Sequence, residues 1–174
     1  TVAMQRLLAL VGRGLADVLG PGMRPQAPRN YHCRCGQPVF FRNSVCLACG
    51  AALGFDPEAL TLRSLLPAPQ PSLWVDAAAG GADAPLLQRC ANFGPAACNW
   101  LLPPGEAAAH EGLCRACRLN RTIPDLDVGD NALLWSRIEV AKRRLVSQLL
   151  ALGLPVRSRV SEDPQRGVMS DFLR

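Results

Sequence analysis

The most regular alternation of apolar and polar positions in this chain lies between residues 131 and 152. Apolar residues recur there every three or four positions, as one face of an α-helix requires; they are Leu134, Trp135, Ile138, Ala141, Leu145, Leu149 and Leu152. Asp130 or Asn131 can cap the start, and Gly153 with Pro155 ends the pattern. Such a helix is roughly 33 Å long. We expect its apolar face to pack on a neighbouring module or on a segment absent from this chain.

Three basic residues, Lys142, Arg143 and Arg144, lie together in the middle of this helix. Glu139 precedes Arg143 by four positions, which is the order that favours an ion pair along a helix. We expect the three basic side chains to face solvent, and contact with nucleic acid is the alternative.

A weaker helical pattern covers residues 1–20, where leucines and a valine recur at near-helical spacing. Gly12 and Gly14 interrupt it, and its apolar run is too short for a targeting signal. We expect a poorly ordered extension here, joined to the rest of the chain by a proline-containing linker that ends at Asn30.

The remaining apolar runs are short and predict little regular structure. One of them contains Phe40 and Phe41, which we expect to be buried. Pro57 suits the first turn of a short helix that reaches Leu62 or Leu66. Residues 72–85 combine alanine, glycine and aspartate around Trp74, which predicts a mobile connection.

The spacing of the cysteines predicts local structure that the hydrophobic pattern does not. Cys33 and Cys35 form one close pair, and Cys46 and Cys49 form another. Two thiol pairs joined by a hairpin-sized spacer can converge on one tetrahedral Zn²⁺, because soft thiolates select that ion and four sulfurs complete its shell.

Two glycines and one histidine bear on this first quartet. Gly36 and Gly50 follow the pairs directly, and glycine adopts the positive φ of a sharp turn at little steric cost. His32 together with Cys35 is a rival first pair of ligands, so His32 is a possible alternative metal ligand. Two disulfides are the other alternative, although such closely spaced cysteines would have to pair across the hairpin.

A second quartet consists of Cys90, Cys98, Cys114 and Cys117. The last two repeat the Cys-x2-Cys spacing, whereas a loop must bring the first two together. We expect a second four-sulfur zinc site, the alternative being that some of these cysteines are ordinary small buried residues.

Composition agrees with metal-stabilised modules. Aromatic residues make up 5% of the 174 residues, and the chain has 15 glycines and 15 prolines, which favours loop-rich segments whose small cores need a metal. The formal net charge of +5 falls to about +1 once eight thiolates and two zinc ions are counted. Global basicity is therefore weak support for nucleic-acid binding.

Cysteine content and hydropathy also bear on location. Eight cysteines without an export signal favour a reducing compartment, and we expect a cytoplasmic protein. No apolar run approaches the ~18 residues of a membrane span.

The dipeptide His110-Glu111 does not begin a zinc-protease motif. That motif is His-Glu-x-x-His, which places two imidazoles one helical turn apart, and here position 114 is cysteine. We expect His110 to be a solvated loop residue, or at most a substitute ligand. Further along, Arg118 and Arg121 flank Asn120, and we expect them to hold neighbouring loops rather than phosphate.

Taken together, several short sequence motifs resemble those of the bacterial zinc-binding metallopeptidase family that carries an N-terminal zinc-ribbon region. These motifs are Cys33-Arg34-Cys35-Gly36-Gln37-Pro38-Val39-Phe40-Phe41, Cys46-Leu47-Ala48-Cys49-Gly50, Cys98-Asn99-Trp100, Cys114-Arg115-Ala116-Cys117-Arg118-Leu119-Asn120-Arg121-Thr122-Ile123-Pro124-Asp125-Leu126 and Leu152-Gly153-Leu154-Pro155. The resemblance covers residues 31 to 173. It implies a zinc-ribbon front and a gluzincin-like peptidase back with a His-Glu-x-x-His helix, and no residue of this chain matches that catalytic part.

The sequence therefore predicts a small α+β protein, with two zinc-ribbon-like β-hairpin modules followed by one long amphipathic helix. We expect an extension and linker at 1–30, a first ribbon at 31–67, a linker at 68–85 and a second zinc module at 86–126. Residues 127–174 would hold the long helix and the start of the peptidase-like domain.

The expected role is structural. Two zinc ions would make the chain a scaffold, or a dock for substrate or partner, without catalysis of its own; the partners would be a downstream peptidase domain or another protein. One alternative is a free-standing nucleic-acid-binding ribbon with phosphate contacts from Arg34, Arg42, Arg115, Arg118 and Arg121. Another is a protein adaptor that uses its helix.

Overall fold

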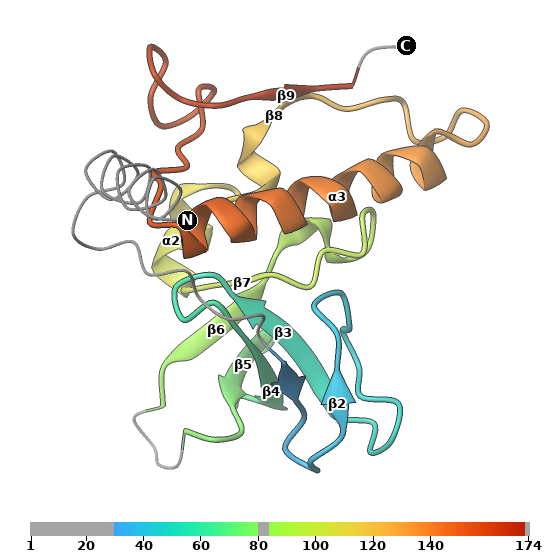
Figure 1. Ribbon diagram of the computed structural model, residues 1–174, viewed down its shortest axis with the longest axis vertical. Helices are drawn as coiled ribbons and strands as arrows, with labels where there is room; N and C mark the ends of the chain where they lie inside the picture. Colours follow the sequence, from blue (N-terminus) through green and yellow to red (C-terminus); the bar gives the residue numbers. More distant parts are fainter. Residues whose placement is uncertain (1–29, 80–83, 173–174) are drawn as a thin grey trace, which may run out of the picture.

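A curled antiparallel sheet forms the base of the protein (Figure 1). The computed structural model describes residues 30–79 and 84–172; the predicted helix at 1–20 and most of its linker lie outside this range. The sheet runs in chain order through β3 (Ala52–Asp56), β4 (Thr61–Pro67), β5 (Leu73–Asp76), β6 (Leu86–Arg89) and β7 (Leu101–Leu102). The sheet curls so that its two edge strands, β3 and β7, come together. The Phe55 N–H of β3 donates to the carbonyl oxygen of Asn99, just before β7, at 2.8 Å.

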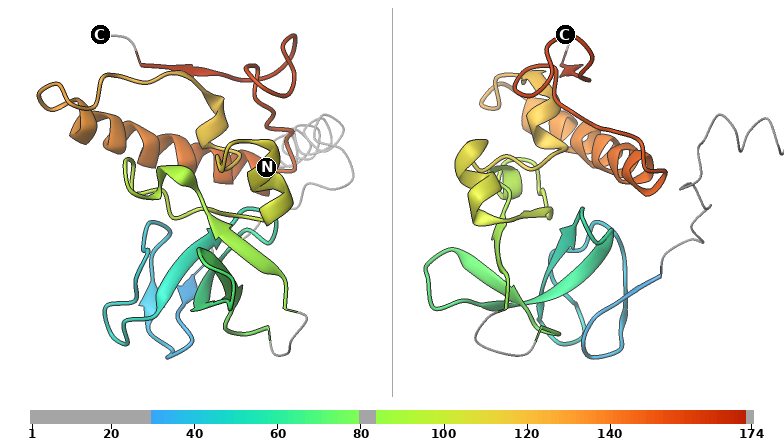
Figure 2. Two further views of the ribbon diagram at one scale, coloured as in Figure 1. Left: turned by 180° about the vertical axis from the view of Figure 1, so that it is seen from behind. Right: turned by 90° about the vertical axis from the view of Figure 1, so that its left-hand side faces the viewer.

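The other elements lie around this sheet. They are the hairpin β1 (Tyr31–His32) and β2 (Pro38–Val39), the helices α2 (Pro104–Ala109) and α3 (Asn131–Ala151), two 3₁₀ turns at Ala91–Phe93 and Cys117–Leu119, and the parallel pair β8 (Asn120–Thr122) and β9 (Ser170–Asp171). Figure 2 shows the segment that carries α2 between the sheet and α3, with β8 and β9 on the far side of α3. The described residues thus contain two α-helices, of which α2 was not predicted from the sequence.

Two expectations between residues 57 and 76 are wrong. Residues 61–67 form β4 instead of a short helix. The Asp56 Oδ1 atom accepts hydrogen bonds from the backbone N–H groups of Glu58 (2.9 Å) and Ala59 (3.2 Å), as a helix N-cap would, but Leu60 then takes φ +51° and the chain turns back to pair with β3 from Thr61 onward. Part of the expected connection is also ordered, since β5 pairs with β4 on one side and with β6 on the other.

The long helix begins and ends close to the predicted residues. Asp130 precedes it, and Gly153 follows it with φ +72°. The Gly153 N–H donates to the Leu150 carbonyl (2.9 Å), and the Leu154 N–H donates to the Leu149 carbonyl (3.0 Å). These two bonds form a Schellman motif, which requires the left-handed conformation that glycine adopts most easily.

The helix uses only part of the predicted apolar face for packing. Trp135, Glu139, Arg143 and Val146 are buried against the rest of the protein. The exposed fractions are 46% for Leu134, 52% for Ile138, 55% for Leu145 and 42% for Leu152. Of the two expected partners of the stripe, a neighbouring module is therefore wrong for these four residues, and packing on a segment outside the described chain stays a prediction.

The basic trio is also placed differently from the prediction. Arg143 is buried, and its Nη2 donates to the carbonyl oxygens of Ala96 (3.1 Å) and Ala97 (3.4 Å). Lys142 bonds to Glu139, and only Arg144 faces solvent fully. The reason is that the neighbouring loop offers unpaired backbone carbonyls, which a charged donor satisfies and an apolar side chain does not.

An aromatic cluster joins the hairpin to the sheet. Phe55 packs against Phe41, with ring centroids 4.7 Å apart, and against Trp100, at 5.1 Å. Both Phe55 and Trp100 are fully buried. Phe40 is 73% exposed, so the expectation that it is buried is wrong, while Phe41 is partly buried as part of this cluster.

Replacing Gly54 with alanine is expected to destabilise the fold by about 1–3 kcal/mol, the usual range for overpacking a dense core. A Cβ atom at this position would lie 2.6 Å from the Leu101 Cδ2 atom, and Leu101 is itself buried. Urea unfolding of the variant measures the effect. The matched control is Gly105→Ala, where nothing lies within 4 Å of the new carbon; equal stability of both variants would contradict the close packing of β3 and β7.

Candidate metal centres

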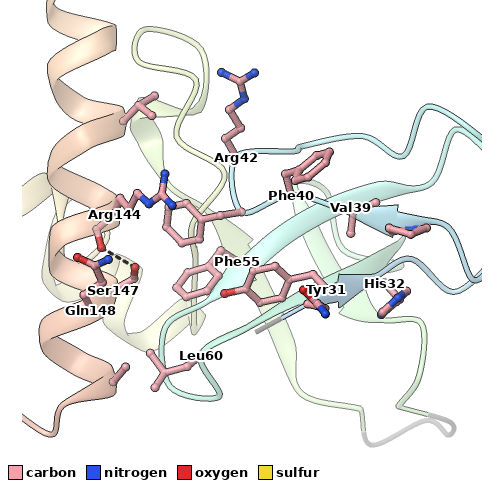
Figure 3. Close-up of a pocket in the computed structure, with 15 residues that line it drawn as sticks. Tyr31, His32, Val39, Phe40, Arg42, Phe55, Leu60, Arg144, Ser147 and Gln148 are labelled. Atoms are coloured by element: carbon pink, nitrogen blue, oxygen red, sulfur yellow. Dashed lines mark hydrogen bonds between the residues drawn. The ribbon is translucent and has the colours of Figure 1, made fainter. Parts of the chain in front are cut away.

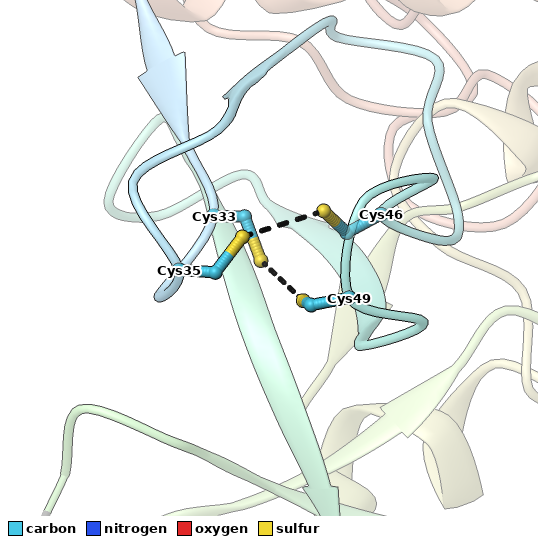
Figure 4. Close-up of side chains that lie close together, drawn as sticks. All are labelled: Cys33, Cys35, Cys46 and Cys49. Atoms are coloured by element: carbon cyan, nitrogen blue, oxygen red, sulfur yellow. Dashed lines mark hydrogen bonds between the residues drawn. The ribbon is translucent and has the colours of Figure 1, made fainter.

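Four thiols converge where the β1–β2 hairpin meets the loop before β3. Cys33 and Cys35 lie in the turn of the hairpin, and Cys46 and Cys49 lie in the loop (Figure 4). All four sulfur atoms lie within 4.8 Å of one another. The Cys33 and Cys49 sulfurs are 3.6 Å apart, and the Cys35 and Cys46 sulfurs are 3.8 Å apart.

Local backbone geometry holds these thiols in place. The Gly36 N–H donates to the Cys33 carbonyl, and the Gly50 N–H donates to the Cys46 carbonyl, both at 2.8 Å. Both glycines have positive φ, +85° and +71°. The turn predicted after each cysteine pair is therefore present. It requires positive φ, which glycine adopts at little steric cost.

A serine on β4 supports the first quartet, and sequence spacing did not predict it. Ser64 is buried; its hydroxyl accepts from the Arg34 N–H at 3.0 Å and donates to the Cys33 sulfur at 3.5 Å. Desolvation raises the pKa of Cys33, but hydrogen bonds from the Cys35 backbone and from Ser64 outweigh it and bring the pKa to about 6. Ser64 thus favours the thiolate form of a candidate ligand.

The same four thiols cannot all ionise without a cation. For Cys49, a backbone hydrogen bond from Ala51 lowers the pKa, but interactions with the Cys35 and Cys33 thiols together raise it to about 12. At these distances, the negative charge of the first thiolates opposes ionisation of the remaining thiols and so raises their pKa. A dication between the sulfurs removes that repulsion, so the quartet is chemically suited to a metal that binds thiolates.

The second quartet lies deeper. Cys90 follows β6, Cys98 precedes β7, and Cys114 and Cys117 follow α2; all four are buried, whereas Cys35 and Cys49 of the first quartet are exposed. The Cys98 sulfur is 3.7 Å from both the Cys114 and the Cys117 sulfur. The Cys114 N–H donates to the Cys90 sulfur at 3.4 Å, and hydrogen bonds from neighbouring thiols lower the pKa of Cys90.

Helix α3 places a charged network beside this second quartet. Glu139 is buried, and its Oε2 atom lies 3.8 Å from the Cys117 sulfur, while its Oε1 atom accepts from Lys142 Nζ at 2.6 Å. Lys142 also donates to Asn120 and to Ser170. Burial raises the pKa of Glu139, and the Lys142 charge opposes that rise. The ammonium thereby brings a positive charge close to a site that would carry four thiolates.

Both quartets fit a tetrahedral zinc ion by a simple geometric test. A Zn–S bond length of about 2.3 Å places the sulfurs of a regular tetrahedron roughly 3.8 Å apart. The four sulfur–sulfur distances given above lie between 3.6 and 3.8 Å, and all eight cysteines are free thiols. The two four-cysteine groups are therefore consistent with two structural zinc ions.

The two histidines lie outside both quartets. His32 is exposed on β1, and the four sulfurs of the first quartet converge without it. His110 is the C-cap residue of α2, and its N–H donates to backbone carbonyls of that helix. Neither histidine joins a group of possible metal ligands among the described residues.

Most of the arginines near the quartets are occupied. Arg118 is buried, with Nη2 2.6 Å from a Glu106 carboxylate oxygen and Nε 3.3 Å from a Glu162 oxygen. Arg115 pairs with Glu58, and Arg121 pairs with Asp171. Arg118 therefore holds neighbouring loops, as predicted, and it is not available as the phosphate contact that a nucleic-acid-binding ribbon would need.

A groove separates the β1–β2 hairpin from α3 (Figure 3). Its volume is about 1020 Å³, and its lining includes the rings of Tyr31, Phe41 and Phe55 together with Arg42 and Arg144. No acidic residue lines it among the residues that the structure describes. Sequence patterns do not predict this groove, because Arg42 and Arg144 are far apart in the chain and no local pattern connects them.

Within residues 30–79 and 84–172, no helix is both long enough and apolar enough to cross a membrane.

Comparison with known proteins agrees with this geometry. The zinc-ribbon domain family matches residues 30–128, more than half of the chain. Uncharacterized proteins of Mycobacterium tuberculosis and Mycobacterium bovis are each 36% identical to it over 146 residues, which cover 83% of this chain and 37% of each relative. The chain thus spans little more than a third of these relatives' length. No solved structure matches it.

Proposed function

Because this chain belongs to the zinc-ribbon domain family, we propose that it is a structural zinc unit which positions other parts of a longer protein. Cys33, Cys35, Cys46 and Cys49 hold one Zn²⁺. A second Zn²⁺ is held by Cys90, Cys98, Cys114 and Cys117. The observation that carries this proposal is the convergence of two complete sets of four thiols, with the sulfur atoms of each set within 4.8 Å of one another.

Zinc supplies cross-linking and charge neutralisation when bound, and the chain's own residues do the rest. The Ser64 hydroxyl orients the Cys33 sulfur, and the Cys114 N–H orients the Cys90 sulfur. Lys142 and Glu139 connect the second site to α3. Since neither quartet includes an oxygen or imidazole ligand and four sulfurs leave no open position, the role is structural rather than catalytic.

We propose that the larger protein in which this unit acts is a zinc metallopeptidase. Its support is the sequence resemblance given above and the greater length of the mycobacterial relatives. The complete His-Glu-x-x-His motif does not occur in this sequence, since cysteine follows His110-Glu111 at position 114. The zinc unit would therefore serve as a scaffold or as a dock for substrate, and peptide-bond cleavage would belong to another part.

Elemental analysis of protein purified without added metal tests the zinc assignment. We expect two zinc ions per chain, and about eight thiols that become reactive only after a chelator removes the metal. One zinc per chain would mean that the second quartet is not a site. Absence of both zinc and free thiols would indicate disulfides and would overturn the proposal.

A further inference from the structure

The outer face of α3 carries an apolar stripe that the fold leaves exposed. Leu134, Ile138, Ala141 and Leu145 follow one another at spacings of four, three and four residues. This is the spacing of the apolar seam by which two helices pack side by side. Each of the four residues is exposed, and Leu152 continues the same line one heptad after Leu145. A helix whose buried face is partly charged thus presents its most apolar face outward.

Positive charge borders this stripe on one side. Arg137 and Arg144 lie one heptad apart, next to the stripe, and both are exposed. Neither forms an ion pair within residues 30–79 and 84–172. Arg144 also lines the groove of Figure 3 together with Arg42, and no acidic residue lies there among the described residues. At Arg137 and Arg144 the border of the stripe is therefore cationic, and neither side chain is neutralised by an ion pair in the described structure.

We propose that this outer face of α3 docks an amphipathic helix whose apolar stripe is flanked by acidic side chains. Leucine-like residues of that helix would pack between Leu134, Ile138 and Leu145. Its carboxylates would pair with Arg137 and Arg144, which burial of the seam would partly desolvate. The inference rests on the proposed scaffold function and adds the chemistry of the element that the scaffold holds.

Charge argues against two other occupants. In a second copy of this chain, Arg137 and Arg144 would border the same seam on both helices, and like charges across an interface are unfavourable. Residues 1–29 contain apolar positions, but also four arginines and only one acidic residue, Asp17. Neither occupant supplies the carboxylates that the cationic border lacks.

Two designed peptides test the proposal on the full zinc-loaded chain. Both are helical, about three heptads long, with leucine at the seam positions; one carries glutamate and the other lysine at the flanking positions. We expect the acidic peptide to bind about tenfold or more tightly than the basic peptide by fluorescence anisotropy, with the difference shrinking at high salt.

Two double variants locate the site. Arg137→Glu with Arg144→Glu is expected to reverse the preference between the two peptides, whereas Arg157→Glu with Arg166→Glu, which makes the same charge change at other exposed positions, is expected to preserve it. Ile138→Asp with Leu145→Asp is expected to abolish binding of both. Unchanged zinc content in each variant separates failure of docking from failure of the zinc assignment.

Three results would overturn the inference. The first is equal affinity for both peptides. The second is a dimer, seen by sedimentation, that Ile138→Asp with Leu145→Asp converts to monomers, because the occupant would then be a second copy. The third is binding that appears only after residues 1–29 are deleted, because those residues would then occupy the face.

Discussion

Replacing Cys114 with serine is expected to remove one zinc ion per chain and to unfold the second module together with the packing of α3. Cys114 is fully buried, and α3 contacts the same quartet through Glu139. A structural zinc contributes roughly 10–16 kcal/mol in small zinc peptides, as much as the whole net stability of a typical domain, about 5–15 kcal/mol. Zinc content and far-UV circular dichroism measure the two effects.

Cys49→Ser is the matched variant in the first quartet. Cys49 is exposed, and α3 makes no contact with any cysteine of that quartet among the hydrogen bonds of the described residues. We expect this variant also to lose one zinc but to keep the helical signal and the buried environment of Trp135. Equal loss of helix in both variants would show that α3 does not depend specifically on the second site.

Arg118→Ala is expected to destabilise the protein by about 3 kcal/mol, at the lower end of the range for removing one partner of a buried ion pair. The Arg118 side chain is only 5% exposed, and it holds Glu106 after β7 and Glu162 near the end of the chain. Removing it leaves two partly exposed carboxylates, with side chains 25% and 21% exposed, without their cation. Urea unfolding measures the change, and the protein should become more sensitive to proteolysis near Glu162.

Arg115→Ala is the control for this prediction. Arg115 lies three residues earlier and pairs with Glu58, whose side chain is 63% exposed. Pairs of this kind are worth less than ~1 kcal/mol, because water screens the charges. If both arginine variants lost the same stability, the buried network around Arg118 would not be the element that holds the end of the chain.

Much of the metal chemistry could be predicted from the sequence, because it depends on local spacing. Two Cys-x2-Cys pairs and the Cys-x-Cys pair predicted six of the eight thiols from spacing, and Cys90 and Cys98 were assigned to the second group because they otherwise lacked partners. The glycines at 36 and 50 gave the turns, since positive φ is a local property. The end of α3 at Gly153 was predicted for the same reason, because a C′ residue acts within one helical turn. Asp130 precedes the helix as predicted, but its side chain makes no capping hydrogen bond.

The strands between residues 61 and 76 show where local reasoning failed. Pro57 favoured a helix start, but the Asp56 carboxylate stabilises a turn, and the following residues pair with β3 and β5. A strand acquires its hydrogen bonds from segments elsewhere in the chain, so its stability is not contained in its own residues. Trp74 and its neighbours were assigned to a connection for the same reason.

By itself, the sequence determined the thiol groups, the sharp turns that hold them, and the existence and ends of the long helix, because each depends on residues a few positions apart. Only the tertiary structure decided which face of that helix is buried. The second module offers backbone carbonyls and a thiol, so Glu139 and Arg143 turn inward. The apolar stripe through Ile138 and Leu145 therefore faces outward, because polar groups removed from water need partners more than apolar ones need burial.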